Sequence, residues 1–120
     1  MNLVALRELA TQQAAARAAA GALAARVRAE FGERVEWIRL FGSLARGDWM
    51  GPDESDVDVA IVVRERVDAD VARIVRLASQ QLWKDGFVFS ARIFSPAEFQ
   101  RLQERELRLA RDILDDGYLL

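Results

Sequence analysis

Hydrophobic and polar positions follow helical and strand periods in turn along this chain, and the changes of period predict six elements. The first segment, from Asn2 to about Phe31, is rich in Ala, Leu, Arg, Gln and Glu, which all favour helix. Within it Leu23, Val27 and Phe31 are four residues apart, so they share one face. Its middle is mostly Ala, which indicates close packing against another element, and Gly32 fits a C-terminal cap.

Three shorter segments have the patterns of strands. Residues 34–41 alternate, with Val35 and Trp37 on one side and Ile38 and Leu40 on the other. Gly-Ser at 42–43 ends that strand, a short helical turn is expected next, and the Gly, Pro and acidic residues up to Ser55 predict a loop. Two further segments, 56–63 (DVDVAIVV) and 87–94 (FVFSARIF), are the second and third strands. The second ends in a continuous apolar run, which is typical of a strand covered on both faces.

Two amphipathic helices complete the pattern. The first covers 68–83, with Asp68 as its expected N-cap. Its core face is predicted from apolar spacing to hold Val71, Ile74, Val75, Ala78 and Leu82. The second opens at 95–98 (SPAE), a capping box with proline at the first helical position, and is expected to run to about Asp116, before Gly117.

The resulting order is α-β-β-α-β-α, which predicts an α/β (α+β) fold with a small mixed β-sheet of three or four strands backed by helices. A chain of 120 residues favours one domain, residues 1–120, with an N-terminal helix at 1–31 and a core at 34–117.

Composition limits the chemistry. The chain has no cysteine and no histidine, so a thiolate nucleophile, a histidine base and a typical zinc site are all excluded. Carboxylates remain, and they favour Mg²⁺ or Mn²⁺. The net charge of −2 argues against nucleic acid as a partner class, because such binders carry a basic excess. The N-terminus lacks the pattern of a signal peptide. The Ala-rich stretch 14–25 is interrupted by Arg17 and lacks large apolar residues, so it cannot span a bilayer. A cytoplasmic location without membrane association is therefore expected.

The residues that carry chemistry lie between 40 and 63 (LFGSLARGDWMGPDESDVDVAIVV). Gly42 allows close backbone approach to a ligand, and Ser43 and the next amides begin a short helix, where N–H groups favour phosphate. Asp56 and Asp58 are two apart at a strand start, so both carboxylates point to one face. Paired carboxylates beside a phosphate cradle are the arrangement that a Mg²⁺–nucleoside triphosphate site needs.

This stretch resembles the signature of the minimal nucleotidyltransferase family, within the DNA polymerase β-like nucleotidyltransferase superfamily. The matching residues are the run 42–48 (GSLARGD), then 55–58 (SDVD), and the ending 94–99 (FSPAEF), so the likeness spans roughly residues 34–117. It implies a nucleotidyltransferase fold, with Gly42 and Ser43 on the triphosphate of ATP or another NTP and with Asp56 and Asp58 as catalytic ligands of Mg²⁺.

The same resemblance implies transfer of AMP from ATP to an acceptor. Many members are antitoxins that bind and adenylylate a small all-helical partner of the HEPN type, so a toxin–antitoxin role and a protein hydroxyl acceptor are expected. Arg46 is assigned to the nucleotide, the alternative being a solvated side chain or a pair with Asp48 that braces the loop.

Two features depart from the family pattern. The spacing from Ser43 to Asp56 is slightly long, which a loop absorbs at low cost. A third carboxylate is expected on the third strand, but that strand has no Asp or Glu, Val88 stands in its place, and Asp85 lies just before it. Its loss would remove a general base worth about 10²–10⁴-fold in rate. The alternative function is therefore a catalytically weak or inactive module that binds nucleotide or a partner protein.

Several residues keep two interpretations. Trp49 and Met50 are large apolar residues in a polar loop, so they either pack inward or meet a base or a partner. Arg92 either reaches solvent at a sheet edge or pairs with Asp56 or Asp58. The Ala-rich first helix is either scaffold or a pairing surface in a homo-oligomer or with a helical partner.

Overall fold

A four-stranded mixed sheet is the centre of the computed structural model, which describes residues 2–120. Its strands are β1 (Val35–Phe41), β2 (Val57–Val63), β3 (Phe89–Phe94) and β4 (Tyr118–Leu119), in the order β3-β2-β1-β4. β1 is antiparallel to β2 and to β4, whereas β2 and β3 are parallel. The predicted mixed sheet is confirmed, and β4 is a strand that the six-element order did not contain.

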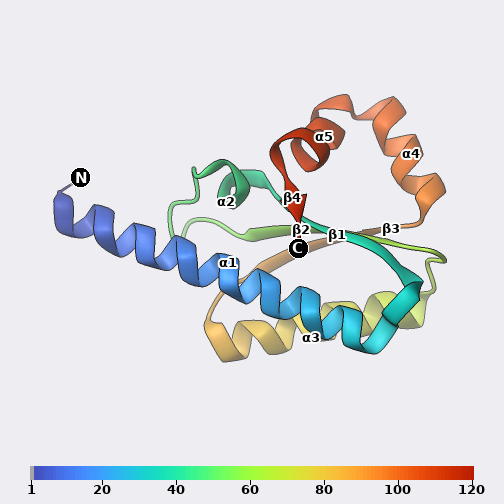
Figure 1. Cartoon of the computed structure of the whole chain (residues 1–120), viewed down its shortest axis with the longest axis horizontal. Helices are drawn as coiled ribbons and strands as arrows, with labels where there is room; N and C mark the ends of the chain where they lie inside the picture. The colour runs from blue at the N-terminus through green and yellow to red at the C-terminus, as the bar shows by residue number, and fades with distance from the viewer. Residues whose placement is uncertain (1) are drawn as a thin grey trace.

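Helices cover both faces of this sheet (Figure 1). They are α1 (Leu3–Phe31), α2 (Gly42–Arg46), α3 (Asp68–Asp85), α4 (Pro96–Arg105) and α5 (Leu107–Arg111), with a 3₁₀ turn η1 (Gly32–Arg34) and a π-helical turn η2 (Asp112–Asp116). α1 and α3 pack on one face, and α4, α5 and η2 lie on the other. Within residues 2–120, no helix has both the length and the apolar character needed to cross a bilayer.

The long helix α1 forms as its composition predicts. Asn2 caps it by accepting a hydrogen bond from the Ala5 N–H at 2.8 Å. Leu23, Val27 and Phe31 are buried on one face, and buried alanines continue that face toward the N-terminus. Small side chains let α1 approach the sheet closely, while its first turns extend beyond the sheet (Figure 1).

Strand β1 contains an irregularity that corrects one predicted face. Val35 pairs with Val63 and Trp37 pairs with Val62, so the register shifts between Val35 and Trp37. The extra residue turns Val35 toward the α1/α3 core, where it joins Ile38, while Trp37 packs on the opposite face. The prediction that Val35 and Trp37 share a side is therefore wrong, because strict alternation takes no account of a bulge.

Helix α3 has the predicted position but a different core face. Ile74, Leu77, Ala78 and Gln81 are buried, whereas 50% of Val75 and 36% of Leu82 are exposed. The apolar residues of α3 form two overlapping stripes on the helix surface. The stripe that includes Leu77 packs against the sheet. The predicted N-cap is also wrong, since Asp68 is already helical and the preceding Val67 makes no side-chain cap.

The C-terminal segment begins as predicted and then departs from a single helix. The Ser95 hydroxyl accepts the Glu98 N–H at 3.1 Å, and the Glu98 carboxylate accepts the Ser95 N–H at 3.0 Å, so the capping box is confirmed. The helix ends at Arg105, and Glu106 leaves helical geometry before α5 and η2 follow.

The half-buried Arg39 on β1 accounts for the turn into β4. Its guanidinium donates to three carbonyl oxygens, those of Ile113 (3.0 Å), Leu114 (3.2 Å) and Gly117 (3.1 Å). A Cβ at Gly117 would stand 2.6 Å from the Leu40 carbonyl oxygen, so only glycine permits the backbone to come this close to β1. Together these contacts fold the end of the chain against the sheet.

Candidate active site

The junction between β1 and α2 touches the start of β2. Phe41, the last residue of β1, pairs with Asp58, and Gly42 follows with a φ of +74°. A Cβ at Gly42 would stand 2.2 Å from Oδ2 of Asp58 and 3.0 Å from its Cγ. Gly42 is therefore needed twice, for its left-handed backbone and for its contact with the Asp58 carboxylate.

The two acidic residues differ in environment. Asp56 is exposed just before β2, whereas Asp58 is half-buried within it. Burial is the main cause that raises the pKa of Asp58, and the negative charges of Asp56 and Asp112 raise it further, while Arg92 and Arg46 oppose the shift. This carboxylate is thus held where its charge lacks full compensation, a situation that a divalent cation relieves.

Asp56 and Asp58 suit Mg²⁺ as a donor pair. Among residues 2–120, no three or more acidic side chains are grouped as a complete ligand set. Mg²⁺ needs no such cage, because it commonly binds one or two carboxylates together with substrate phosphates and water. The hard oxygen donors and the raised pKa of Asp58 therefore fit a cation that arrives with a nucleotide.

Ser43 is the second residue of α2 and directly follows Gly42, which lies against Asp58. Ser43 is partly exposed. The first-turn N–H groups of a helix have no acceptor within the helix, and here Phe41 supplies no side-chain cap. Amides, a hydroxyl and a carboxylate pair are thus gathered at one end of the sheet.

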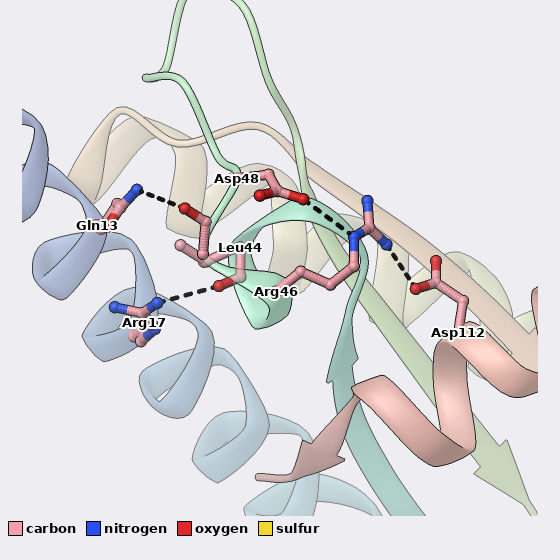
Figure 2. Close-up of polar contacts among 7 residues, drawn as sticks. Gln13, Arg17, Leu44, Arg46, Asp48 and Asp112 are labelled. Carbon is pink, nitrogen blue, oxygen red and sulfur yellow. Dashed lines mark hydrogen bonds and ion pairs between the residues drawn. The ribbon is translucent and has the colours of Figure 1, made fainter.

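Helix α1 holds the chain that follows α2 in place (Figure 2). Arg17 donates to the Leu44 carbonyl oxygen at 3.1 Å, and Gln13 donates to those of Trp49 at 2.9 Å and Gly47 at 3.4 Å. The Trp49 side chain is fully buried, with its ring centroid 5.8 Å from that of Phe87. Of its two interpretations, inward packing is the one the structure shows.

Arg46 is engaged on both sides by carboxylates (Figure 2). Its guanidinium lies 2.5 Å from Asp112 and 3.3 Å from Asp48. The hydrogen bond to Asp112 is the main cause that raises the Arg46 pKa. The predicted pair with Asp48 is present, but the sequence did not single out Asp112, which is 66 residues away and reaches the site only through the turn at η2.

Strand β3 provides the neighbour of Asp58 on the other side. Ser90 is its register partner, and Arg92 lies two residues further on the same face, exposed, with a charge that lowers the Asp58 pKa. Val88 precedes the strand and accepts the Val57 N–H through its carbonyl at 2.8 Å. Asp85 is hydrogen-bonded to Gln81 at the end of α3. Val88 and Asp85 therefore do not supply a third carboxylate beside Asp58.

A cavity of about 630 Å³ lies next to Arg46, between α2 and the C-terminal turns. It is lined by Arg46, Leu107, Arg108, Arg111, Asp112 and Asp116. The three arginines of this lining favour anionic groups. The two aspartates in the same lining neutralise part of the positive charge. Gly42, Ser43, Asp56 and Asp58 are not among the cavity's lining residues, so Arg46 and Asp112, whose charges act on Asp58, connect this cavity with the acidic pair.

Comparison with known proteins adds to this geometry. Residues 22–119 match the family model described as a nucleotidyltransferase domain. The chain is 32% identical over 94 residues to a candidate protein adenylyltransferase of Methanocaldococcus jannaschii, covering 78% of this chain and 86% of the relative.

Two solved structures share the fold at 20% identity. A candidate nucleotidyltransferase from Sulfolobus solfataricus superposes with a TM-score of 0.53, over 99% of this chain and 87% of that one. A mutant of the MntA–HpeT toxin–antitoxin complex gives 0.50, over 79% of this chain and 66% of that one. With a family model covering most of its length and a relative above 30% identity, this chain belongs to the nucleotidyltransferase domain family, of the DNA polymerase β-like type.

Proposed function

We propose that this chain is a Mg²⁺-dependent enzyme that moves a nucleotidyl group, AMP from ATP, to a protein hydroxyl. One observation carries the proposal. Gly42 brings the start of α2 against the Asp58 carboxylate, so phosphate donors and metal ligands meet at one point. The name of the M. jannaschii relative favours ATP as donor and a protein as acceptor.

Each residue has a role that follows from its position. Asp56 and Asp58 hold the cation, which when bound neutralises the phosphates and polarises the α-phosphate. The backbone at Gly42 and the amide and hydroxyl of Ser43 bind the β- and γ-phosphates. Arg46 turns from Asp112 toward the triphosphate, which offers it a bidentate anionic partner of higher charge.

The proposed acceptor enters from the cavity beside Arg46, whose arginines suit an acidic or phosphate-bearing surface. In the proposed transfer the hydroxyl oxygen bonds to the α-phosphorus, the bond from that phosphorus to the oxygen bridging to the β-phosphate breaks, pyrophosphate leaves, and the hydroxyl proton passes to water. No carboxylate stands at Ser90 to take the hydroxyl proton, so slow turnover is part of the proposal.

We further propose an antitoxin role, in which the acceptor is a small all-helical HEPN-type protein. The support is the fold shared with a component of the MntA–HpeT toxin–antitoxin complex. A neighbouring gene for such a helical protein would identify the acceptor to assay.

The second candidate is a module of the same fold that binds nucleotide or partner and neutralises it stoichiometrically. The observation that favours it is β3, where Asp58 faces Ser90 rather than a third carboxylate. Where that module binds nucleotide, the two candidates differ only in turnover; where it binds a partner alone, they also differ in nucleotide binding.

The experiment is thermal unfolding with and without Mg-ATP, followed by transfer of labelled AMP to the co-purified partner. At 100 times its dissociation constant, a ligand stabilises the fold by about 2.7 kcal/mol. The shift in Tm should require Mg²⁺ and vanish in Asp58→Asn. Asp53→Asn, an exposed loop carboxylate outside the site, should keep it. A shift without labelled product supports the binding module, and no shift with any nucleoside triphosphate removes both nucleotide-dependent proposals.

A further inference from the structure

Strand β3 lies at one end of the sheet, so one side of its backbone has no strand partner among residues 2–120. The Val57 N–H donates to the Val88 carbonyl at 2.8 Å, and the pairing with β2 is parallel. This pattern directs the amides and carbonyls of residues 88, 90 and 92 toward β2. Those of residues 89, 91 and 93 therefore point outward, where another strand can bind them.

The exposed edge of β3 has few of the sequence features that prevent one strand from pairing with another. The sequence of β3, FSARIF, contains no proline and no lysine, and Arg92 is its one charged residue. At one end, the side chain of Arg66 donates to the Ile93 carbonyl oxygen at 3.3 Å. A carbonyl oxygen has two lone pairs, so this contact leaves room for a second donor.

Apolar side chains flank the same edge. Val75, Leu82 and Val88 are 50%, 36% and 42% exposed, and Trp83 at the end of α3 is 90% exposed. A groove of about 370 Å³ separates α3 from β3, and Val75, Leu82 and Val88 are among the residues that line it. Two of these, Val75 and Leu82, belong to the helix face that the sequence predicts as core and that the sheet leaves uncovered.

We propose that a second copy of this chain occupies the edge, paired antiparallel through β3 about a two-fold axis at Ala91. In this register Ala91 faces Ala91, and Phe89 faces Ile93. All three residues have outward amides and carbonyls, so they make the hydrogen-bonded pairs of an antiparallel ladder. Their side chains lie on the α3 face, so the Phe89–Ile93 pairs continue the apolar surface at Val75 and Leu82.

Charges in this register fit a self-complementary interface. Arg92 faces Ser90 of the second copy rather than Arg92, which avoids a like-charge pair directly across the ladder. Each chain has a net charge of only −2, so long-range repulsion between copies is small. A two-fold interface needs one patch that matches itself, and the edge of β3 with the exposed side of α3 provides that.

The test is the molar mass of the nucleotide-free protein by light scattering and sedimentation, for wild type, Ala91→Pro and Val75→Glu. The Ala91 N–H points outward, so proline there removes no hydrogen bond to β2, while it removes a donor that the second copy needs. Val75 is half exposed, so glutamate is compatible with a folded single chain. Leu6→Glu is the matched control, since Leu6 is 49% exposed on α1, away from this edge.

Wild type and the control should have twice the chain mass of 13.5 kDa, and each β3-edge variant should raise the dimer dissociation constant by more than about tenfold. Amide hydrogen exchange gives an independent pattern. The amides of Phe89, Ala91 and Ile93 should be protected more at higher protein concentration, while those of Ser90 and Arg92 stay unchanged. A wild type that is one chain at high micromolar concentration, or a dimer that survives both variants, overturns the proposal. Because no nucleotide is present, neither result depends on the transferase activity.

Discussion

Replacing Gly42 with alanine tests the contact on which the candidate site depends. The new Cβ would be 2.2 Å from Oδ2 of Asp58, so that carboxylate or α2 must move by about 1 Å to reach ordinary contact. A φ of +74° costs alanine about 1–2 kcal/mol, and the overpacked contact adds about 1–3 kcal/mol. Because Gly42 lies against a proposed metal ligand, displacing that ligand should also weaken Mg-ATP binding, by about 10–100-fold.

Two other glycines separate these effects. Gly47 has a φ of +87°, and a Cβ there would have nothing within 4 Å, so Gly47→Ala should lose only the backbone contribution, about 1–2 kcal/mol. Gly21 lies in α1 with open space around it, so Gly21→Ala should stabilise the helix by up to about 1 kcal/mol. Urea unfolding measures stability, and titration calorimetry measures Mg-ATP affinity. If Gly42→Ala matches Gly47→Ala in both, the contact with Asp58 does not shape the site.

Three further predictions concern charge. The folded-state pKa of Asp58 is raised above its ordinary value of 3.8, so its ionisation destabilises the fold as pH rises through that raised pKa. Asp58→Asn should therefore be more stable than wild type at pH 7 without Mg²⁺, and urea unfolding should show this gain disappear below pH 3.8. Asp112→Asn frees Arg46 and removes a negative charge, so calorimetry should show Mg-ATP binding strengthened by up to about tenfold. Arg39→Met leaves three carbonyls without their donor, which should cost about 3 kcal/mol and speed amide exchange in residues 112–119.

Elements with strong local signals were predictable from the sequence. The capping box at Ser95 and Glu98 and the apolar run of β2 depend on neighbouring residues, and the structure has both where they were expected. The face of α3 was not predictable in the same way. Its apolar residues form two adjacent stripes, and the choice between them depends on the sheet, to which Leu77 packs more closely than Val75.

The C-terminal turns could not be predicted from local sequence, because their position depends on residues far away in the chain. β4 has only two residues, too few for a pattern of its own, and its place depends on Arg39, far away in sequence. The same turn carries Asp112 to Arg46. The sequence motif could therefore indicate Gly42 and Asp58 as neighbours, but it could not show that a distant carboxylate joins them.

Asp112 is a candidate for the role of the third carboxylate that β3 lacks. Its negative charge acts on Asp58 from the side of η2, while on the side of β3 the neighbour is Ser90. The ion pair at 2.5 Å holds Asp112 and Arg46 together until a more strongly anionic ligand competes for the guanidinium. A triphosphate would release Asp112 at the moment when a base is needed. Asp112→Asn separates the two roles, because tighter Mg-ATP binding with unchanged transfer leaves Asp112 as a partner of Arg46 alone, whereas tighter binding with transfer reduced by about 10²-fold or more makes it the base that β3 lacks.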